Sequence, residues 1–451
     1  MKKPSGLSHT TSRALIFFLS LIALMALSWG VARWRAQTTD PTSAQDYLDG
    51  VAGRAGSPTD RRIGNLQSQL QTNPEDWPAY SQLGAAYLQK ARETGDPTYY
   101  QKAEEALQTA LDHEPGDYAA VSALGELALA RHDFRGALEW GEWAAGLNPN
   151  RAPALGVIVD AQVELGRYDD AVRTLQTMVD LRPDLSSFSR VSYLRELNGD
   201  VEGAIKAMRM ALDAGGPHTE NTHWTRVQLG HLYFNSGRLA DAEAQYQSAL
   251  ALDADYAPAQ AGMARVHAAR GQYDEAIRLY IEATNRMPLA EYVIALGEVY
   301  EQTGRPDEAQ KQFDLVRAIE QLYIANGVNT DLEMALFAAD HPIEGQDMGE
   351  GVRRARQGQA ERPTIYSADV LAWALYQDGQ DAEAHEWAQK ALALGAQDAL
   401  KFYHAGMIAR RVGEQAKARE YLERALRINP YFSLKYAAEA QTTLKQLQAG
   451  N

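Results

Sequence analysis

Two short polar stretches carry the residue types from which metal sites and acid–base catalysts are built. His218, Glu220 and His223 lie close together, and two imidazoles with one carboxylate could ligate a divalent ion. A five-residue spacing between the histidines, in a polar stretch, matches no recognisable ligand set. We therefore interpret this cluster as part of a solvated loop.

A second collection, Asp340-His341 with Asp347 and Glu350, also lacks a ligand spacing, and we interpret it in the same way. The chain has no G-x-x-x-x-G-K-S/T loop, no G-x-S-x-G elbow and no H-E-x-x-H helix. It also has no cysteine, which excludes thiolate metal sites and cysteine nucleophiles. We expect no catalytic residue, no cofactor and no metal site. An enzyme with its site within 331–363 is the alternative.

The charge of the chain limits its partners. Asp and Glu number 59 against 44 Lys and Arg, so the formal net charge is −15. This argues against a protein whose main task is to bind nucleic acid or an anionic membrane surface. Arg353, Arg354 and Arg356 form a local basic run, which we interpret as an exposed helix face. A contact for an acidic partner is the alternative.

The elements that would position a site follow an apolar run near the N-terminus. Residues 14–32 contain no charged side chain and, as a helix, are long enough to cross the hydrocarbon core of a bilayer. Basic residues within 1–13 weakly favour a cytoplasmic N-terminus and an exported remainder. We predict a single-pass protein of the inner (cytoplasmic) membrane with its array outside the cytoplasm. The alternative is a cleaved signal peptide, with cleavage near 30–32, and secretion.

Between this run and the first repeat we predict a spacer. Residues 33–59 are rich in small, polar, Gly and Pro residues and are predicted to be a flexible tether. Residues 60–72 then read as one amphipathic helix with Ile63, Leu66 and Leu70 on one face.

From residue 60 onward the chain repeats. A small marker residue recurs in steps of 33 or 34, except for steps of 38 and 42, and a second mostly small residue follows seven positions later. The markers are Ala103, Ala137, Ala171, Ala204, Ala242, Ala276, Ala309, Gly351, Ala384 and Ala418. In seven units a Gly stands five positions before the marker, where a tight turn between two helices needs a positive φ. Each unit is predicted to be a helix, a tight turn and a second helix.

This pattern resembles the tetratricopeptide repeat family, whose Leu-Gly-x-x-Tyr half-motif stands here in several units. The clearest copies are Leu83-Gly84 with Tyr87, Leu229-Gly230 with Tyr233, and Leu296-Gly297 with Tyr300. The resemblance implies an all-α fold, a right-handed superhelical solenoid of about ten helix-turn-helix units. It also implies a capping helix and tail within 431–451, and a concave groove that takes up a peptide, a loop or a helix of a partner.

The irregular steps predict irregular structure. Extra residues at 90–101 are expected to bulge from a turn. The linker 213–222 should account for the step of 38 residues between the markers Ala204 and Ala242. An unusually long second helix is expected over 306–325. A hinge or break near 326–330 would divide the array into 60–325 and 326–430.

The family resemblance also implies which residues line the groove. They are Glu126, Asp160, Tyr193, Glu196, His231, Phe234, Glu298, Glu301, Trp373, Tyr376 and Tyr403. Acidic and aromatic side chains dominate, so the groove should suit a basic or apolar segment. For each aromatic residue the alternative is packing between neighbouring helices.

Together, these features predict a membrane-tethered, non-catalytic scaffold that binds a protein or peptide partner in its groove. Residues 73–77 running into Leu83-Gly84 look similar to the anchored repeat subunits of cytochrome c maturation, which present apocytochrome for haem attachment. An assembly chaperone of that kind is the alternative.

Overall fold

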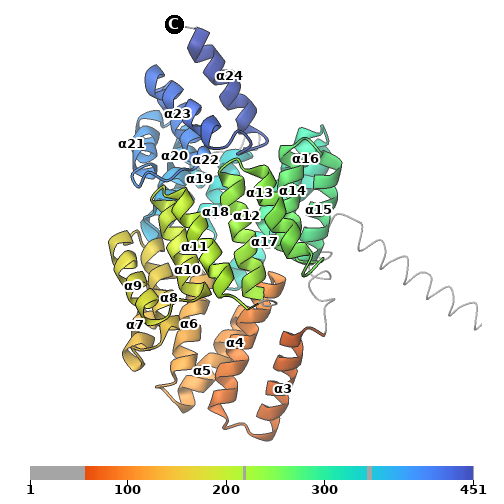
Figure 1. Ribbon diagram of the computed structural model, residues 1–451, viewed down its shortest axis with the longest axis vertical. Helices are drawn as coiled ribbons and strands as arrows, with labels where there is room; N and C mark the ends of the chain where they lie inside the picture. The colour runs from red at the N-terminus through yellow and green to blue at the C-terminus, as the bar shows by residue number, and fades with distance from the viewer. Residues whose placement is uncertain (1–55, 217–219, 343–347, 450–451) are drawn as a thin grey trace, which may run out of the picture.

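The computed structural model describes residues 56–216, 220–342 and 348–449. Within these ranges the chain forms twenty-two α-helices and no β-strand (Figure 1). A leading helix, α3 (Pro58–Thr72), precedes ten helix pairs, and α24 (Tyr436–Ala449) follows them. The pairs are α4 (Trp77–Thr94) and α5 (Thr98–His113), α6 (Tyr118–Ala130) and α7 (Phe134–Leu147), α8 (Ala152–Glu164) and α9 (Tyr168–Leu181), α10 (Leu185–Leu197) and α11 (Val201–Ala214), α12 (Glu220–Asn235) and α13 (Leu239–Leu250), α14 (Ala257–Ala269) and α15 (Tyr273–Arg286), α16 (Ala290–Gln302) and α17 (Pro306–Ala325), α18 (Asp331–Asp340) and α19 (Gly349–Glu361), α20 (Ile365–Gln377) and α21 (Asp381–Ala391), and α22 (Ala399–Arg411) and α23 (Gln415–Ile428).

The predicted membrane span, 14–32, lies outside the described residues, as does nearly all of the predicted tether. In the described part of the chain, no helix is both long and apolar enough to cross a bilayer. The span and the tether therefore stay predictions.

The repeat markers explain why the two helices of a unit pack closely. Ala137 and Ala144, like their counterparts in most other units, are completely buried between the helices. The seven predicted turn glycines all have positive φ, between +67° and +88°, which confirms the predicted turns. In the second unit His132 takes the same place with φ 60° and is the one described non-Gly residue with a positive φ.

The extra residues of the first unit do not bulge from a turn, so that prediction was wrong. They lengthen α4, which has 18 residues against 13 in α6. The added helical turns pack on α3, where Lys90 Nζ lies 2.6 Å from Asp60 and Thr59 donates a hydrogen bond to Glu93. Because these contacts are made by a helix, the extension stays helical up to Gly95.

The second helix of the seventh unit, α17, runs over Pro306–Ala325 as predicted. Beyond it the buried core does divide, since α18 contributes Phe337 to one large cluster and Leu332 to the next. The connecting loop is not a free hinge, however. The backbone N–H of Asn329 donates to the carbonyl oxygen of Arg131, 3.0 Å away, in the tight turn of the second unit. The domain boundary itself stays a prediction.

This contact belongs to a regular series, which we call the seam. The tight turn of each of the first five units faces the loop that follows the unit five places further on. In chain order, Gly95 faces Met287 and Leu289, Arg131 faces Asn329, Gly166 faces Pro363, Gly199 faces Gly395, and Gly237 faces Asn429. In Figure 1 the C-terminal pairs, in blue, lie directly next to α8 to α11, in yellow to green. Successive turns of the superhelix are thus in direct contact.

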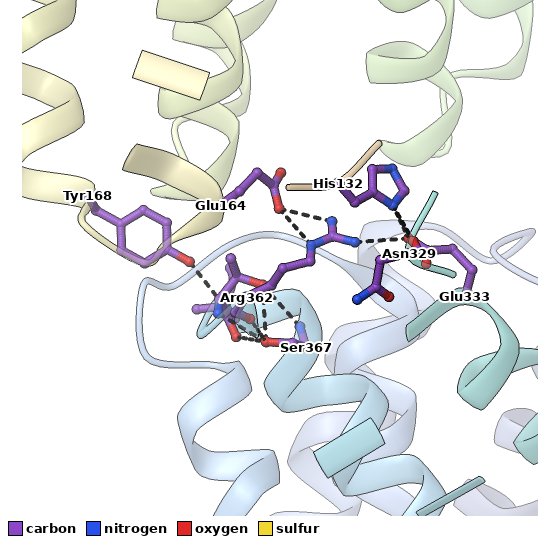
Figure 2. A network of polar contacts seen from close by, with 9 residues as sticks. His132, Glu164, Tyr168, Asn329, Glu333, Arg362 and Ser367 are labelled. Atoms are coloured by element: carbon purple, nitrogen blue, oxygen red, sulfur yellow. Dashed lines mark hydrogen bonds and ion pairs between the residues drawn. The ribbon is translucent and has the colours of Figure 1, made fainter. Parts of the chain in front are cut away.

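The seam is held mainly by polar groups. At its centre Arg362 reaches Glu164 on one side and Glu333 on the other, at 2.9 and 3.0 Å (Figure 2). Nearby, the backbone N–H of Ile365 donates to the Tyr168 hydroxyl at 3.0 Å. The three buried clusters built from residues 66–197 include no residue from the loops across the seam. Hydrogen bonds and ion pairs are therefore the main contacts at the centre of the seam, whereas apolar contacts occur at its ends, where Met287 and Leu289 face Gly95 and Leu434 packs on the cluster of residues 204–337.

Candidate partner-binding cavity

The closed turn surrounds a cavity of about 1340 Å³. Its wall comes from the first helices of seven successive units, α4, α6, α8, α10, α12, α14 and α16. Residues three or four apart share a helix face, so the wall shows a helical period, as in Ala261, Arg265 and Ala268 of α14. The predicted concave groove is thus present as a half-open cavity on the inner side of the closed turn.

Seven of the eleven predicted groove residues line this cavity. They are Glu126, Asp160, Tyr193, Glu196, His231, Phe234 and Glu298. Phe234 is only 1% exposed, and the guanidinium of Arg265 lies 3.9 Å from its ring centre. Its ring is therefore part of the packed wall, whereas Tyr193, at 44% exposed, is open to the cavity.

The other four predicted groove residues lie elsewhere. Trp373 and Tyr403 are 1% and 0% exposed, and Tyr376 stacks on Trp373 with ring centres 4.8 Å apart. Their rings fill the core between α18, α20, α22 and α24, so the helix-packing alternative describes them. Glu301 is half exposed and faces His341 at 3.9 Å, away from the cavity wall. For the three aromatic residues the prediction of groove positions fails because no residue of α20 lines the cavity and, of α22, only Leu400 does.

Sequence reasoning missed two exposed aromatic residues of the cavity, Trp224 and Tyr431, each 42% exposed. Trp224 stands seven residues before His231 on α12, which is two helical turns along the same face. That period was a usable signal for Trp224. Tyr431 had no such signal, because its segment was predicted to be helical and is instead a loop.

The cavity wall carries eight carboxylates against four arginines, and three of the carboxylates are paired with an arginine. Arg190 makes two hydrogen bonds with Asp160, at 2.8 and 2.6 Å. Further pairs join Arg92 to Glu126 at 3.5 Å and Arg182 to Asp184 at 2.9 Å. These arginines are therefore already engaged within the chain and would not attract an acidic ligand.

His231 and Glu196, both predicted groove residues, have strongly shifted pKa values. Burial lowers the pKa of His231 to about 3, helped by Arg265, so its imidazole is neutral at neutral pH. Its Nδ1 lies 2.8 Å from the Tyr246 hydroxyl. The pKa of Glu196 is raised to about 7, mainly by burial and also by the like charge of Asp398. Lys401 and a hydrogen bond from Asn235 act in the opposite direction.

One end of the cavity is closed by the loop between α23 and α24. Leu434 of this loop packs on the large buried cluster of residues 204–337. Lys435 Nζ donates to the carbonyl oxygen of Asp340 at 2.6 Å, and the Tyr436 hydroxyl donates to its carboxylate at 2.8 Å. The predicted capping helix begins at Tyr436 instead of 431, because the residues before it serve as this closure.

Replacing Asp340 by alanine is expected to loosen this closure. The carboxylate accepts hydrogen bonds from the Trp373 indole and the Tyr436 hydroxyl, both at 2.8 Å, and the loss of a buried acceptor costs about 2 kcal/mol. Amide exchange across 436–449 should accelerate, as measured by mass spectrometry. Tyr436→Phe removes one of the two bonds and should have a smaller effect. Unchanged protection of α24 in Asp340→Ala would show that other contacts hold it.

The candidate polar clusters have structural roles. Asp340 and His341 were interpreted as a solvated loop, which is wrong: the His341 side chain is 6% exposed and lies between Phe313 and Phe337. In the other cluster, Glu220 accepts a hydrogen bond from the Tyr256 hydroxyl at 3.2 Å. His218 and Asp347 lie outside the described residues. Among the residues that are described, no group of three His, Cys, Asp or Glu could hold a metal ion.

The basic run lies along α19, and each of its arginines is paired within the chain. Arg353 and Arg354 both contact Glu350, at 2.6 and 3.1 Å. Arg356 contacts Glu383 at 2.6 Å on the neighbouring unit. This agrees with the interpretation of the run as a helix face, and it leaves these charges internally compensated.

Comparisons with solved structures return other repeat proteins. The chain is similar to TTC0263, a thermophilic TPR protein in Thermus thermophilus, at 23% identity and a TM-score of 0.34, with 40% of this chain and 91% of that one covered. It is also similar to PilW, a type IV pilus biogenesis factor, at 18% identity and a TM-score of 0.37, with 45% of this chain and 92% of that one covered. The Cut9-Hcn1 hetero-tetramer of the APC/C matches at 14% identity and a TM-score of 0.33, with 91% of this chain and 99% of that one covered. These TM-scores carry no argument about a partner of this chain. No curated protein sequence matches it.

Family models give the assignment. Five models described as tetratricopeptide repeat match residues 98–152 and 157–218, 233–294, 290–314, 364–397 and 402–432. Together they cover more than half of the chain, and each matched segment falls on helices of the pairs, while α4 and the pair α18 and α19 lie outside the matches. The chain therefore belongs to the tetratricopeptide repeat family.

Proposed function

We propose that this protein is a non-catalytic scaffold that holds an extended segment of a protein partner inside its cavity. The observation that carries the proposal is the presence of exposed aromatic side chains within a half-open cavity. Tyr193, Trp224 and Tyr431 are each more than two-fifths exposed, yet all three face the cavity. Large aromatic rings that stay accessible in such a space are typical anchors for a partner segment.

We also propose that the array is tethered to a membrane through 14–32 and lies outside the cytoplasm. The support is the uncharged apolar run and the basic residues before it. Protease treatment of cells with a permeabilised outer envelope tests this orientation. Digestion of the array while a cytoplasmic marker stays intact would support it, and protection of the array would contradict it. The cytochrome c alternative rests on 73–77, which do not line the cavity.

Trp224→Ala is expected to reduce partner capture, and Trp143→Ala is the matched control. Trp143 is 43% exposed on α7 but does not line the cavity. Truncating an aromatic anchor at an interface typically costs about 2 kcal/mol, which corresponds to a loss of affinity of more than tenfold. Partners are captured by crosslinking in cells, identified by mass spectrometry, and compared between the variants. Equal losses with both changes, or with neither, would contradict binding in the cavity.

A further inference from the structure

We propose that Tyr193 and Glu196 form a subsite for one lysine or arginine side chain of the partner segment. The inference rests on the proposed function, since it takes the cavity to be where the segment binds. Both residues line the cavity and stand three apart on α10, so their side chains are neighbours on one helix face. An aromatic ring beside a carboxylate is the combination that binds a cation through its charge and through the ring face.

The protein uses this combination repeatedly for its own arginines. In several units a guanidinium lies over an aromatic ring and pairs with a carboxylate. The clearest cases are Arg238 with Tyr233 (4.5 Å) and Asp241 (2.8 Å), Arg305 with Tyr300 (4.3 Å) and Glu308 (3.0 Å), and Arg411 with Tyr376 (3.6 Å) and Asp381 (3.5 Å). Tyr193 and Glu196 present the ring and the carboxylate, but no cation within the described ranges lies over the ring or pairs with Glu196.

The groups around Glu196 do not neutralise it. On α22 the nearest cation, Lys401, is held by Asp398 at 2.6 Å, and its side chain is 11% exposed. Asp398 itself acts on Glu196 as a like charge, and α12 contributes only the Asn235 amide. A cation from the partner would therefore be stabilised at Glu196 by a charge that the chain leaves uncompensated.

The aromatic side chain is also accessible. Tyr193 is 44% exposed, and the described part of the chain offers its hydroxyl no hydrogen bond. Arg265 shares Asn235 with Glu196, but its guanidinium lies over Phe234 and is hydrogen-bonded to Asn235 at 3.3 Å. It therefore does not compete for the Tyr193 ring. The subsite is open towards the interior, where a bound segment would run.

The pH dependence of binding follows from the state of Glu196. Its pKa is raised to about 7, so about half of the carboxylates are protonated at neutral pH, and only the ionised form attracts a cation. Binding of a cationic segment should therefore tighten as the pH rises from about 6 to about 8. The same raised pKa means that the stability contributed by protonated Glu196 is present below its unfolded pKa. That contribution is lost as the pH rises through about 7.

The test uses the full chain and two labelled peptides that differ in one group. Both are short, extended sequences of Gly, Ser and Leu, one with a central arginine and one with citrulline, which has the same shape without the charge. Fluorescence polarisation should show the arginine peptide bound roughly tenfold more tightly, with the difference growing as the pH rises. Glu196→Gln should abolish both the preference and its pH dependence. Tyr193→Phe should keep the preference and Tyr193→Ala should weaken it.

Glu386→Gln is the matched control, because Glu386 is exposed on α21 and does not line the cavity. It removes the same charge from the protein and should leave the preference unchanged. Equal binding of the two peptides to the wild type, or a preference that survives Glu196→Gln, overturns the subsite but leaves the scaffold proposal standing. Binding of neither peptide, together with unaltered partner capture by Trp224→Ala, contradicts both. Circular dichroism of each variant confirms that the helices are retained.

Discussion

Gly166→Ala is expected to open the seam, whereas Gly271→Ala is expected to leave it closed. Both glycines stand at the same place in their units, with φ of +67° and +74°, so an added Cβ carries a similar backbone cost of about 1 kcal/mol at each. They differ in their surroundings. A Cβ at Gly166 would lie within 3.0 Å of the carbonyl oxygen of Pro363, and one at Gly271 would meet nothing within 4 Å.

The difference between these two variants therefore isolates the contact between superhelical turns. Small-angle scattering should show a larger radius of gyration for Gly166→Ala and an unchanged one for Gly271→Ala. The free energy of unfolding should fall by about 3 kcal/mol in the first variant and about 1 kcal/mol in the second. Equal effects on shape and stability would mean that the two turns are not in contact in solution.

The seam could not be predicted from the sequence, although the tight turns that form one side of it could. The glycine five positions before each marker predicted a positive φ, and the structure confirms it at Gly166. That a loop lies against this glycine depends on the rotation added by each unit along the superhelix. A period of 34 residues does not specify this rotation. Many of the contacts it produces join residues 195 to 198 positions apart, such as Tyr168 and Ile365.

The same reason separates the correct from the incorrect groove residues. Tyr193 and Trp373 were both predicted to line the groove from their places in the repeat, yet one is 44% and the other 1% exposed. What differs is the neighbour on the concave side. At Tyr193 the closed turn leaves a cavity, whereas at Trp373 the helices α18, α22 and α24 fill the space, and Asp340 accepts the indole N–H. A repeat motif assigns a residue to a face, and the superhelix decides whether that face is open.

The first unit illustrates a second limit. Its longer period showed that residues were inserted near 90–101, but a helix extension and a loop add the same number of residues. The choice is made by α3, which supplies Asp60 as the partner of Lys90. Extending α4 also brings Gly95 to the seam, where the Tyr323 hydroxyl donates to its carbonyl oxygen at 3.1 Å. The insertion thus contributes to closing the turn.

Arg362→Ala is expected to weaken the seam by removing ion pairs, whereas Gly166→Ala acts through a steric clash. The Arg362 side chain is 12% exposed and pairs with both Glu164 and Glu333. Without the guanidinium, these two carboxylates would face each other across the seam with no cation between them. Because both acids are partly exposed, we expect a loss of about 2 kcal/mol, less than for a fully buried pair. Arg353→Ala is the control, since that side chain is 58% exposed and its loss should leave the free energy of unfolding nearly unchanged.

The charge origin of the Arg362 effect can be separated from lost packing. Its guanidinium also lies 4.9 Å from the Phe134 ring centre, so some of the loss belongs to that contact. Combining Arg362→Met with Glu164→Gln and Glu333→Gln removes the opposed carboxylates and should recover much of the stability lost in Arg362→Met alone. Added salt should lower the melting temperature of the wild type more than that of this triple variant. A triple variant no more stable than Arg362→Met would show that packing, and not charge, makes Arg362 important to the seam.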